Sequence, residues 1–219
     1  MQPKAFKAVL FDLDGTLIDT LEDLADSMNA TLDTLGLPQH PAESYRRFVG
    51  KGVEQLVQEA APAARTDQKL RIELLAGMRE QYARHWSNKS RPYPGIPELL
   101  KALDERGVVK AVFSNKPHDF TVLCVAELLR DWRFDAVYGL LGGVPPKPDP
   151  TGARRIAREL AIRPAEFLYL GDTDIDMKTA IGSGMFPVGA LWGFRAADEL
   201  KVSGAERLVA HPLEVLELF

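Results

Sequence analysis

The feature that most constrains the fold is a regular alternation of two kinds of segment after Gly95. Short apolar segments, many of them β-branched, recur at about 108–113, 136–138, 167–170, 187–191 and 208–210. Segments whose apolar residues have helical spacing lie before or between them, at about 98–105, 120–129 and 151–161. Strands that alternate with helices through short connections form parallel sheets covered by helices. The chain is therefore predicted to contain an α/β domain with a parallel sheet.

One more apolar segment, 8–11, is separated from this region by a long helical stretch. Apolar residues recur at three- and four-residue spacing over about 21–35, which predicts an amphipathic helix. Residues 42–88 are rich in Glu, Gln, Arg and Ala and contain no strand-like segment, and the Pro- and Gly-containing residues 91–95 are typical of a linker. We expect a core formed by residues 1–18 and 91–219, with an all-helical insert formed by residues 19–90.

Composition limits the partners that the protein can have. The 219 residues carry a formal net charge of −4, which favours neither nucleic acid nor an anionic membrane surface. The single cysteine, Cys124, excludes an intrachain disulfide and fits a reducing compartment. Asp12 interrupts the first apolar run, so we expect no secretory signal, and no run of 18 apolar residues predicts a membrane span. We expect a cytoplasmic monomer or homodimer that binds neither nucleic acid nor membranes.

Acidic side chains follow two of the predicted strands at their C-terminal ends. Asp12 and Asp14 come directly after the first strand, and Asp172 and Asp176 follow the strand at 167–170. In open α/β sheets, ligands bind beyond the C-terminal ends of the strands. If the two strands lie near each other, the four carboxylates meet at one site.

Four carboxylates at one site repel one another and raise one another's pKa values, so cations must offset them. Lys147, in the loop before the predicted helix at 151–161, is one candidate cation. Oxygen-only ligands, without His or Cys nearby, favour a hard ion, so Mg²⁺ is the predicted second cation. Ser114 ends the strand at 108–113, and its hydroxyl can donate a hydrogen bond to a phosphate oxygen. Backbone N–H groups around Leu13 and Asn115 are further candidate donors.

This set of groups predicts phosphoryl transfer. A carboxylate such as Asp12 can accept a phosphoryl group in a covalent step. Asp14, two residues further along, points the same way if the strand geometry persists. It is placed to protonate the leaving oxygen and later to deprotonate the attacking water. General acid–base catalysis of this kind typically raises the reaction rate about 10²–10⁴-fold.

Four motifs, in order over nearly the whole chain, resemble those of the haloacid dehalogenase-like hydrolases. They are Asp12-Leu-Asp-Gly-Thr16, Ser114-Asn-Lys116, Lys147-Pro-Asp-Pro150 and Gly171-Asp-Thr-Asp-Ile-Asp176. The resemblance implies that Asp12 is the nucleophile and Asp14 the acid/base. It implies that Ser114 binds phosphate and Lys147 neutralises charge. It also implies that Mg²⁺ is held by Asp172, Asp12 and the backbone carbonyl of Asp14, with Asp176 supporting the metal through water.

Further features are similar to the phosphoglycolate phosphatases. These are Asn115-Lys-Pro117, the helical insert with Gly50-Lys-Gly52, and Trp192-Gly193. This resemblance implies a Rossmann-like catalytic core with helices on both faces and a cap domain inserted after the first strand. The implied substrate is 2-phosphoglycolate, with Asn115, Lys51 and Lys116 as substrate-binding residues.

The sequence leaves alternatives open. The substrate of a phosphatase could instead be pyrophosphate, a nucleotide or a sugar phosphate. A phosphomutase would use Asp12 and Asp14 in the same way, whereas a dehalogenase would need neither Asp14 nor a metal. A catalytically silent binding protein would not need every catalytic position to be filled, as it is here. Lys51 and Lys116 could also be ordinary solvated lysines.

Overall fold

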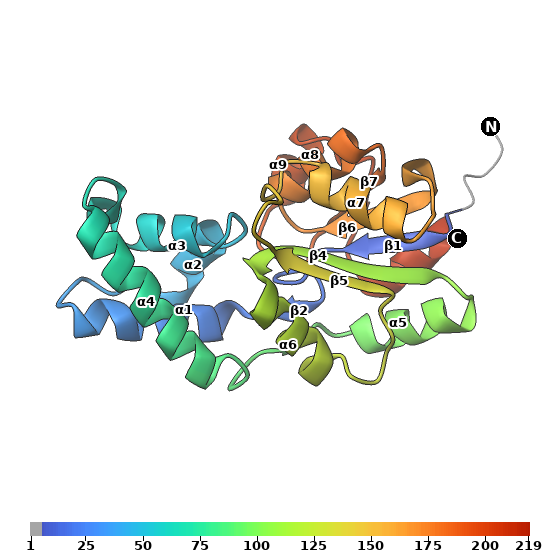
Figure 1. The fold of residues 1–219 in the computed structure, drawn as a ribbon. Helices are drawn as coiled ribbons and strands as arrows, with labels where there is room; N and C mark the ends of the chain where they lie inside the picture. Colours follow the sequence, from blue (N-terminus) through green and yellow to red (C-terminus); the bar gives the residue numbers. More distant parts are fainter. Residues whose placement is uncertain (1–5) are drawn as a thin grey trace. The chain divides into compact units, whose positions relative to one another are not determined.

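The structure, a computed structural model, describes residues 6–219 and divides the chain into two compact units (Figure 1). The first comprises the N-terminal part up to Ile18 together with Pro92–Phe219, and the second comprises Asp19–Arg91. The chain passes between them through β2 (Ile18–Asp19) and β3 (Arg91–Pro92), which pair as a two-stranded sheet.

The first unit is built on a six-stranded sheet in the order β5-β4-β1-β6-β7-β8. Its strands are β1 (Ala8–Phe11), β4 (Val109–Pro117), β5 (Ala136–Leu140), β6 (Phe167–Gly171), β7 (Phe186–Ala190) and β8 (Arg207–Val209). All neighbouring strands pair in parallel. The short strand β1 is central, with Leu10 opposite Ala111 of β4 and Tyr169 of β6. The predicted parallel α/β fold is confirmed.

Helices cover both faces of this sheet. They are α5 (Ile96–Glu105), α6 (His118–Leu128), α7 (Thr151–Glu159), α8 (Asp174–Ser183) and α9 (Ala197–Val202), with 3-10 turns η2 (Pro164–Glu166) and η3 (Pro212–Leu218). Figure 1 shows α7, α8 and α9 on one face and α5 and α6 on the other. Leu10, Phe113 and Tyr169 from three strands pack with Ile156 of α7 and Ala180 of α8 in a buried core. This core fixes the sheet edge from which the acidic residues emerge.

The second unit is helical. It contains α1 (Leu21–Thr34), α2 (Ala42–Phe48), α3 (Val53–Ala60), η1 (Pro62–Arg65) and α4 (Gln68–His85). Asp23, at the start of α1, is buried and accepts hydrogen bonds from the backbone N–H groups of Lys89 and Ser90 and from the Ser90 hydroxyl. The first helix of the unit is thereby tied to the segment that follows its last helix.

Two elements differ from the prediction. The strand expected to end at Ser114 continues to Pro117, although its register with β5 shifts after Phe113. No helix was predicted after the strand at 167–170, but α8 begins at Asp174, where Thr173 and Asp176 form a reciprocal capping box. Among residues 6–219, no helix is both long and apolar enough to cross a membrane.

Candidate active site

Three buried carboxylates meet at the C-terminal edge of the sheet. Asp12 follows β1, Asp172 follows β6, and Asp176 lies in the first turn of α8. One carboxylate oxygen from each lies within 4.8 Å of the others. Phe11 pairs with Leu170, so the segments that follow β1 and β6 leave the sheet side by side. Asp12 is 5% exposed, and Asp172 and Asp176 are 0% exposed, so all three carboxylates are shielded from bulk water.

Lys147 supplies the positive charge at this cluster. Its Nζ lies 2.8 Å from Oδ1 of Asp12 and 2.7 Å from Oδ1 of Asp176, and its side chain is buried. Asn115 holds the Lys147 backbone from both sides. The Lys147 N–H donates to Asn115 Oδ1 at 2.8 Å, and Asn115 Nδ2 donates to the Lys147 carbonyl at 3.1 Å. The lysine is thus fixed both at its backbone and at its ammonium group.

The electrostatics of the cluster follow from this burial. Burial and the neighbouring Asp176 raise the pKa of Asp12 well above its usual range, although Lys147 partly offsets them. Burial and Asp176 also raise the pKa of Asp172 to about 7, against hydrogen bonds that favour its ionised form. Burial opposes the charge on Lys147, but Asp12 and Asp176 outweigh it and hold the pKa of the ammonium well above its usual value. Three ionised carboxylates would exceed the charge of one lysine, so in the absence of a further cation the site favours the protonated forms of Asp12 and Asp172.

Hydrogen bonds fix the orientation of the other two carboxylates. The Thr16 hydroxyl donates to Oδ1 of Asp172 at 2.9 Å, and the Phe194 N–H donates to Oδ2 at 2.8 Å. The Thr173 hydroxyl and N–H both donate to Oδ2 of Asp176, at 2.6 and 3.1 Å. These donors were not singled out from the sequence. Thr16 and Thr173 could have been identified, because they lie within the motifs and carry hydroxyl donors. The Phe194 donor could not, because a backbone N–H does not depend on residue type.

The donor set fits a hard divalent cation. All three clustered groups offer oxygen, and oxygen ligands of Mg²⁺ or Ca²⁺ lie about 2.0–2.6 Å from the ion. Two ligands of such an ion are then at most roughly 4–5 Å apart, and the three oxygens, which lie within 4.8 Å of one another, are close enough to share one ion. The raised pKa values of Asp12 and Asp172 indicate the same need for a further positive charge.

Asp14 lies outside this carboxylate cluster and pairs with a different lysine. Lys116 Nζ lies 2.7 Å from Oδ1 of Asp14, and both side chains are largely buried. The Lys116 N–H donates to the Ser114 hydroxyl oxygen at 3.1 Å. The structure thus links Asp14, Lys116 and Ser114 beside the group formed by Asp12 and Lys147.

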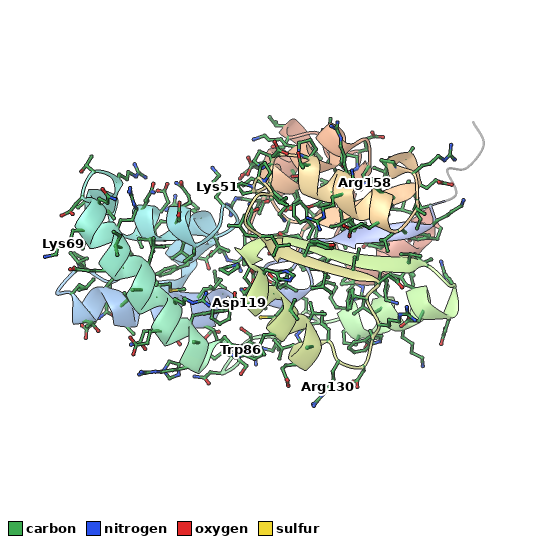
Figure 2. All side chains as sticks on the ribbon, viewed as in Figure 1. Lys51, Lys69, Trp86, Asp119, Arg130 and Arg158 are labelled. Carbon is green, nitrogen blue, oxygen red and sulfur yellow. The ribbon has the colours of Figure 1, made fainter. Side chains whose placement is uncertain are left out.

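The structure places three groups that were expected to bind phosphate or substrate. Asn115 bonds to the backbone of Lys147, as described above, and the Leu13 N–H donates to Asp12 Oδ1 at 2.7 Å. Lys51 is exposed in the second unit, in the loop between α2 and α3 (Figure 2). Its contact with substrate stays a prediction.

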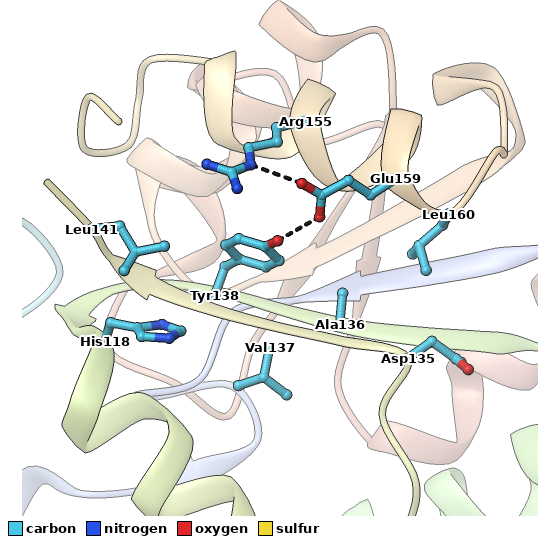
Figure 3. Close-up of a pocket in the computed structure, with 9 residues that line it drawn as sticks. All are labelled: His118, Asp135, Ala136, Val137, Tyr138, Leu141, Arg155, Glu159 and Leu160. Atoms are coloured by element: carbon cyan, nitrogen blue, oxygen red, sulfur yellow. Dashed lines mark hydrogen bonds and ion pairs between the residues drawn. The ribbon is translucent and has the colours of Figure 1, made fainter. Parts of the chain in front are cut away.

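A cavity of about 460 Å³ lies elsewhere on the first unit, along β5 (Figure 3). Its lining residues are His118, Asp135, Ala136, Val137, Tyr138, Leu141, Arg155, Glu159 and Leu160. None of them belongs to the acidic cluster. Arg155 Nε lies 2.8 Å from Glu159 Oε1, and the Tyr138 hydroxyl also donates to Glu159, so these charges satisfy one another. The cavity is therefore not the predicted site.

Known proteins resemble this chain over most of its length. The family profile of the haloacid dehalogenase-like hydrolases matches residues 9–190. A protein of Aquifex aeolicus named phosphoglycolate phosphatase is 32% identical over 188 residues, which is 86% of each chain. A protein of the same name from Xanthomonas campestris is 31% identical over 215 residues, covering 96% of this chain and 95% of its own.

A solved structure has the same fold. It comes from Lactobacillus delbrueckii subsp. bulgaricus and is provisionally named a phosphoglycolate phosphatase. It matches with a TM-score of 0.90 and 31% identity, covering 97% of both chains. The four sequence motifs, the sheet order and the profile match agree, and the chain belongs to the haloacid dehalogenase-like hydrolase family.

Proposed function

We propose that this hydrolase is a Mg²⁺-dependent phosphomonoesterase that acts through an aspartyl-phosphate on Asp12. The observation that carries the proposal is the buried group formed by Asp12, Asp172, Asp176 and Lys147. A buried excess of carboxylates is costly unless cations compensate it. A substrate phosphate accompanied by Mg²⁺ would enter a site that already needs positive charge.

Asp12 is the proposed nucleophile. The contacts from Lys147 and Leu13 both go to its Oδ1, so Oδ2 is the oxygen proposed to attack phosphorus. A bond forms between this oxygen and phosphorus, and the bond from phosphorus to the leaving oxygen breaks. Asp14 donates a proton to that oxygen. In the second step Asp14 takes a proton from water, which attacks the aspartyl-phosphate and releases phosphate and free Asp12.

The carboxylates of Asp12 and Asp172 and the backbone carbonyl of Asp14 are proposed to hold Mg²⁺, with Asp176 acting through water. When bound, Mg²⁺ neutralises charge on the phosphoryl group during transfer. Lys147 remains beside Asp12 and Asp176 as a fixed cation. Ser114 is proposed to donate a hydrogen bond to a phosphate oxygen.

The proposed substrate is 2-phosphoglycolate, which is split to glycolate and phosphate. Two relatives named phosphoglycolate phosphatase, each more than 30% identical over at least 86% of this chain, support this choice. The helical unit, residues 19–91, is proposed to act as a cap that excludes water and reads the rest of the substrate. Lys51 would meet the carboxylate of the substrate.

Phosphate release from a panel of phosphomonoesters tests the proposal. The panel holds 2-phosphoglycolate, pyrophosphate, nucleotides and sugar phosphates, each assayed with Mg²⁺ and then with excess EDTA. We expect 2-phosphoglycolate to give the highest kcat/KM, and EDTA to abolish activity until Mg²⁺ is restored. A higher kcat/KM for another compound would overturn the substrate, and full activity in EDTA would overturn the metal dependence.

A further inference from the structure

We infer that residues Trp192, Gly193 and Phe194 position Asp172 for metal binding, although they lie outside the four motifs. The inference rests on the proposed Mg²⁺ site. These residues follow β7, and β6 lies between β1 and β7 in the sheet. The segments after β1 and β7 therefore flank Asp172, which follows β6.

Two donors from these flanking segments fix the carboxylate of Asp172. Phe194 N–H binds Oδ2 from the β7 side at 2.8 Å, and the Thr16 hydroxyl binds Oδ1 from the β1 side at 2.9 Å. Because both oxygens are held, rotation of the carboxylate costs a hydrogen bond. One lone pair of each oxygen remains for a cation.

The absence of a side chain at two glycines shapes the space around this carboxylate. A Cβ at Gly193 would lie 2.3 Å from Asp172 Cβ and 2.4 Å from the carbonyl oxygen of Gly15. A Cβ at Gly15 would lie 2.4 Å from Asp172 Oδ2. The backbone angle φ of Gly193 is not positive, so other residues could adopt its backbone conformation. Glycine is needed at this position because a side chain has no space there. A methyl group at position 193 must therefore displace Asp172 or the backbone beside it.

A side chain joins the two flanking segments directly. Trp192 Nε1 donates to the carbonyl oxygen of Thr16 at 2.9 Å. This bond fixes Thr16, which donates to Asp172 Oδ1, relative to the segment of Phe194, which donates to Oδ2. Outer partners of metal ligands typically change metal affinity or activity by about 10–100-fold when they are mutated.

The inference is tested by measuring the dissociation constant of Mg²⁺ for the substrate-free protein by isothermal titration calorimetry. We expect Gly193→Ala to raise the Mg²⁺ dissociation constant about 10–100-fold. Trp192→Phe, which keeps a ring but removes the donor, should raise it by a smaller factor. Gly142→Ala is the matched control, because a Cβ there meets nothing within 4 Å. Circular dichroism checks that each variant is folded.

The outcomes separate this inference from the proposed function. If the wild-type protein binds no Mg²⁺, the proposed metal site fails and the inference fails with it. If the wild-type protein binds Mg²⁺ and Trp192→Phe binds it equally well, only the positioning role is overturned. Trp192→Phe alone decides the question if Gly193→Ala does not fold.

Discussion

Lys116 Nζ lies 2.7 Å from Oδ1 of Asp14, so the proposed acid/base is paired with a largely buried lysine from the neighbouring strand. The two residues are far apart in the sequence and meet because β1 and β4 are adjacent. Lys116 was expected from the resemblance to touch substrate. Its observed partner offers a second role, which is to hold the Asp14 carboxylate in place.

Replacing Lys116 with methionine distinguishes the two roles. If Lys116 acts through Asp14, Lys116→Met should lower kcat about 10–100-fold and leave KM within a few-fold of the wild type, since acid–base help is worth about 10²–10⁴-fold. Steady-state kinetics with saturating Mg²⁺ measure both constants. Lys116→Arg keeps the charge and should restore part of kcat. A large rise in KM with kcat unchanged would instead assign Lys116 to substrate binding.

Asp12→Asn tests the covalent mechanism. The amide is nearly the same size but is a far weaker nucleophile, so kcat should fall on the order of 10⁴-fold or more, as for other enzymes that lose a nucleophile. Asp174→Asn is the control, because Asp174 lies in the same α8 turn as Asp176 but pairs with Lys178. That variant should keep activity within a few-fold of the wild type. Wild-type turnover by Asp12→Asn would contradict the mechanism.

The raised pKa of Asp172 makes stability depend on pH when no metal is present. The pKa is about 7 in the folded protein because of burial and Asp176, and near 3.9 in the unfolded chain. At pH values between these two pKa values, Asp172 is protonated in the folded protein and ionised in the unfolded chain. The free energy of unfolding should therefore fall as pH rises from about 4 to about 7, by at most about 1.4 kcal/mol per pH unit for this group.

Urea unfolding in EDTA at several pH values between 4 and 8 measures this slope. Asp172→Asn cannot titrate at this position and should make the slope shallower, while Asp12, whose pKa is also raised, supplies the rest. Mg²⁺ binds the ionised form, so adding it should raise stability most at the upper end of this pH range. An identical slope in wild type and Asp172→Asn would show that Asp172 is not responsible.

Asn115→Ala tests whether Asn115 acts on Lys147 or on substrate. The variant removes the two hydrogen bonds that hold the Lys147 backbone, and it leaves buried polar groups unpaired at a cost of about 1–3 kcal/mol. We expect a lower free energy of unfolding and a lower kcat, with little change in KM. Asn88→Ala, at an exposed asparagine, controls for the loss of an amide. An unchanged stability with a raised KM would favour substrate binding.

The parts of the site that were predictable are those that depend on local sequence. Asp12 and Asp172 each follow a short apolar segment, and the rule that parallel strands present ligand-binding residues at their C-terminal ends places both at one edge. The helix α8 was not predicted, because aspartates such as Asp174 and Asp176 are common in turns as well as at helix starts. Its cap depends on reciprocal hydrogen bonds between Thr173 and Asp176.

Other features depend on which distant segments meet. The pairing of Lys116 with Asp14 follows from strand order, which residue types do not specify. The polar residues after Phe113 interrupt the apolar pattern, yet β4 continues through them, because strand pairing uses the backbone and not the side chains. The same limit applies to the Phe194 N–H, since every residue except proline has such a donor.

The central position of β1 has a consequence for the order in which the protein is made. This strand precedes the other strands of its sheet in the chain, but Ala8 pairs with Val109 on one side and with Phe167 on the other. The segment that carries Asp12 therefore gains its first strand partner only after residue 109 has been translated and its second only after residue 167. Residues 19–91 make many of their contacts within their own unit and can become ordered earlier. The acidic cluster is complete only after the polypeptide has passed residue 176, so it forms late in synthesis.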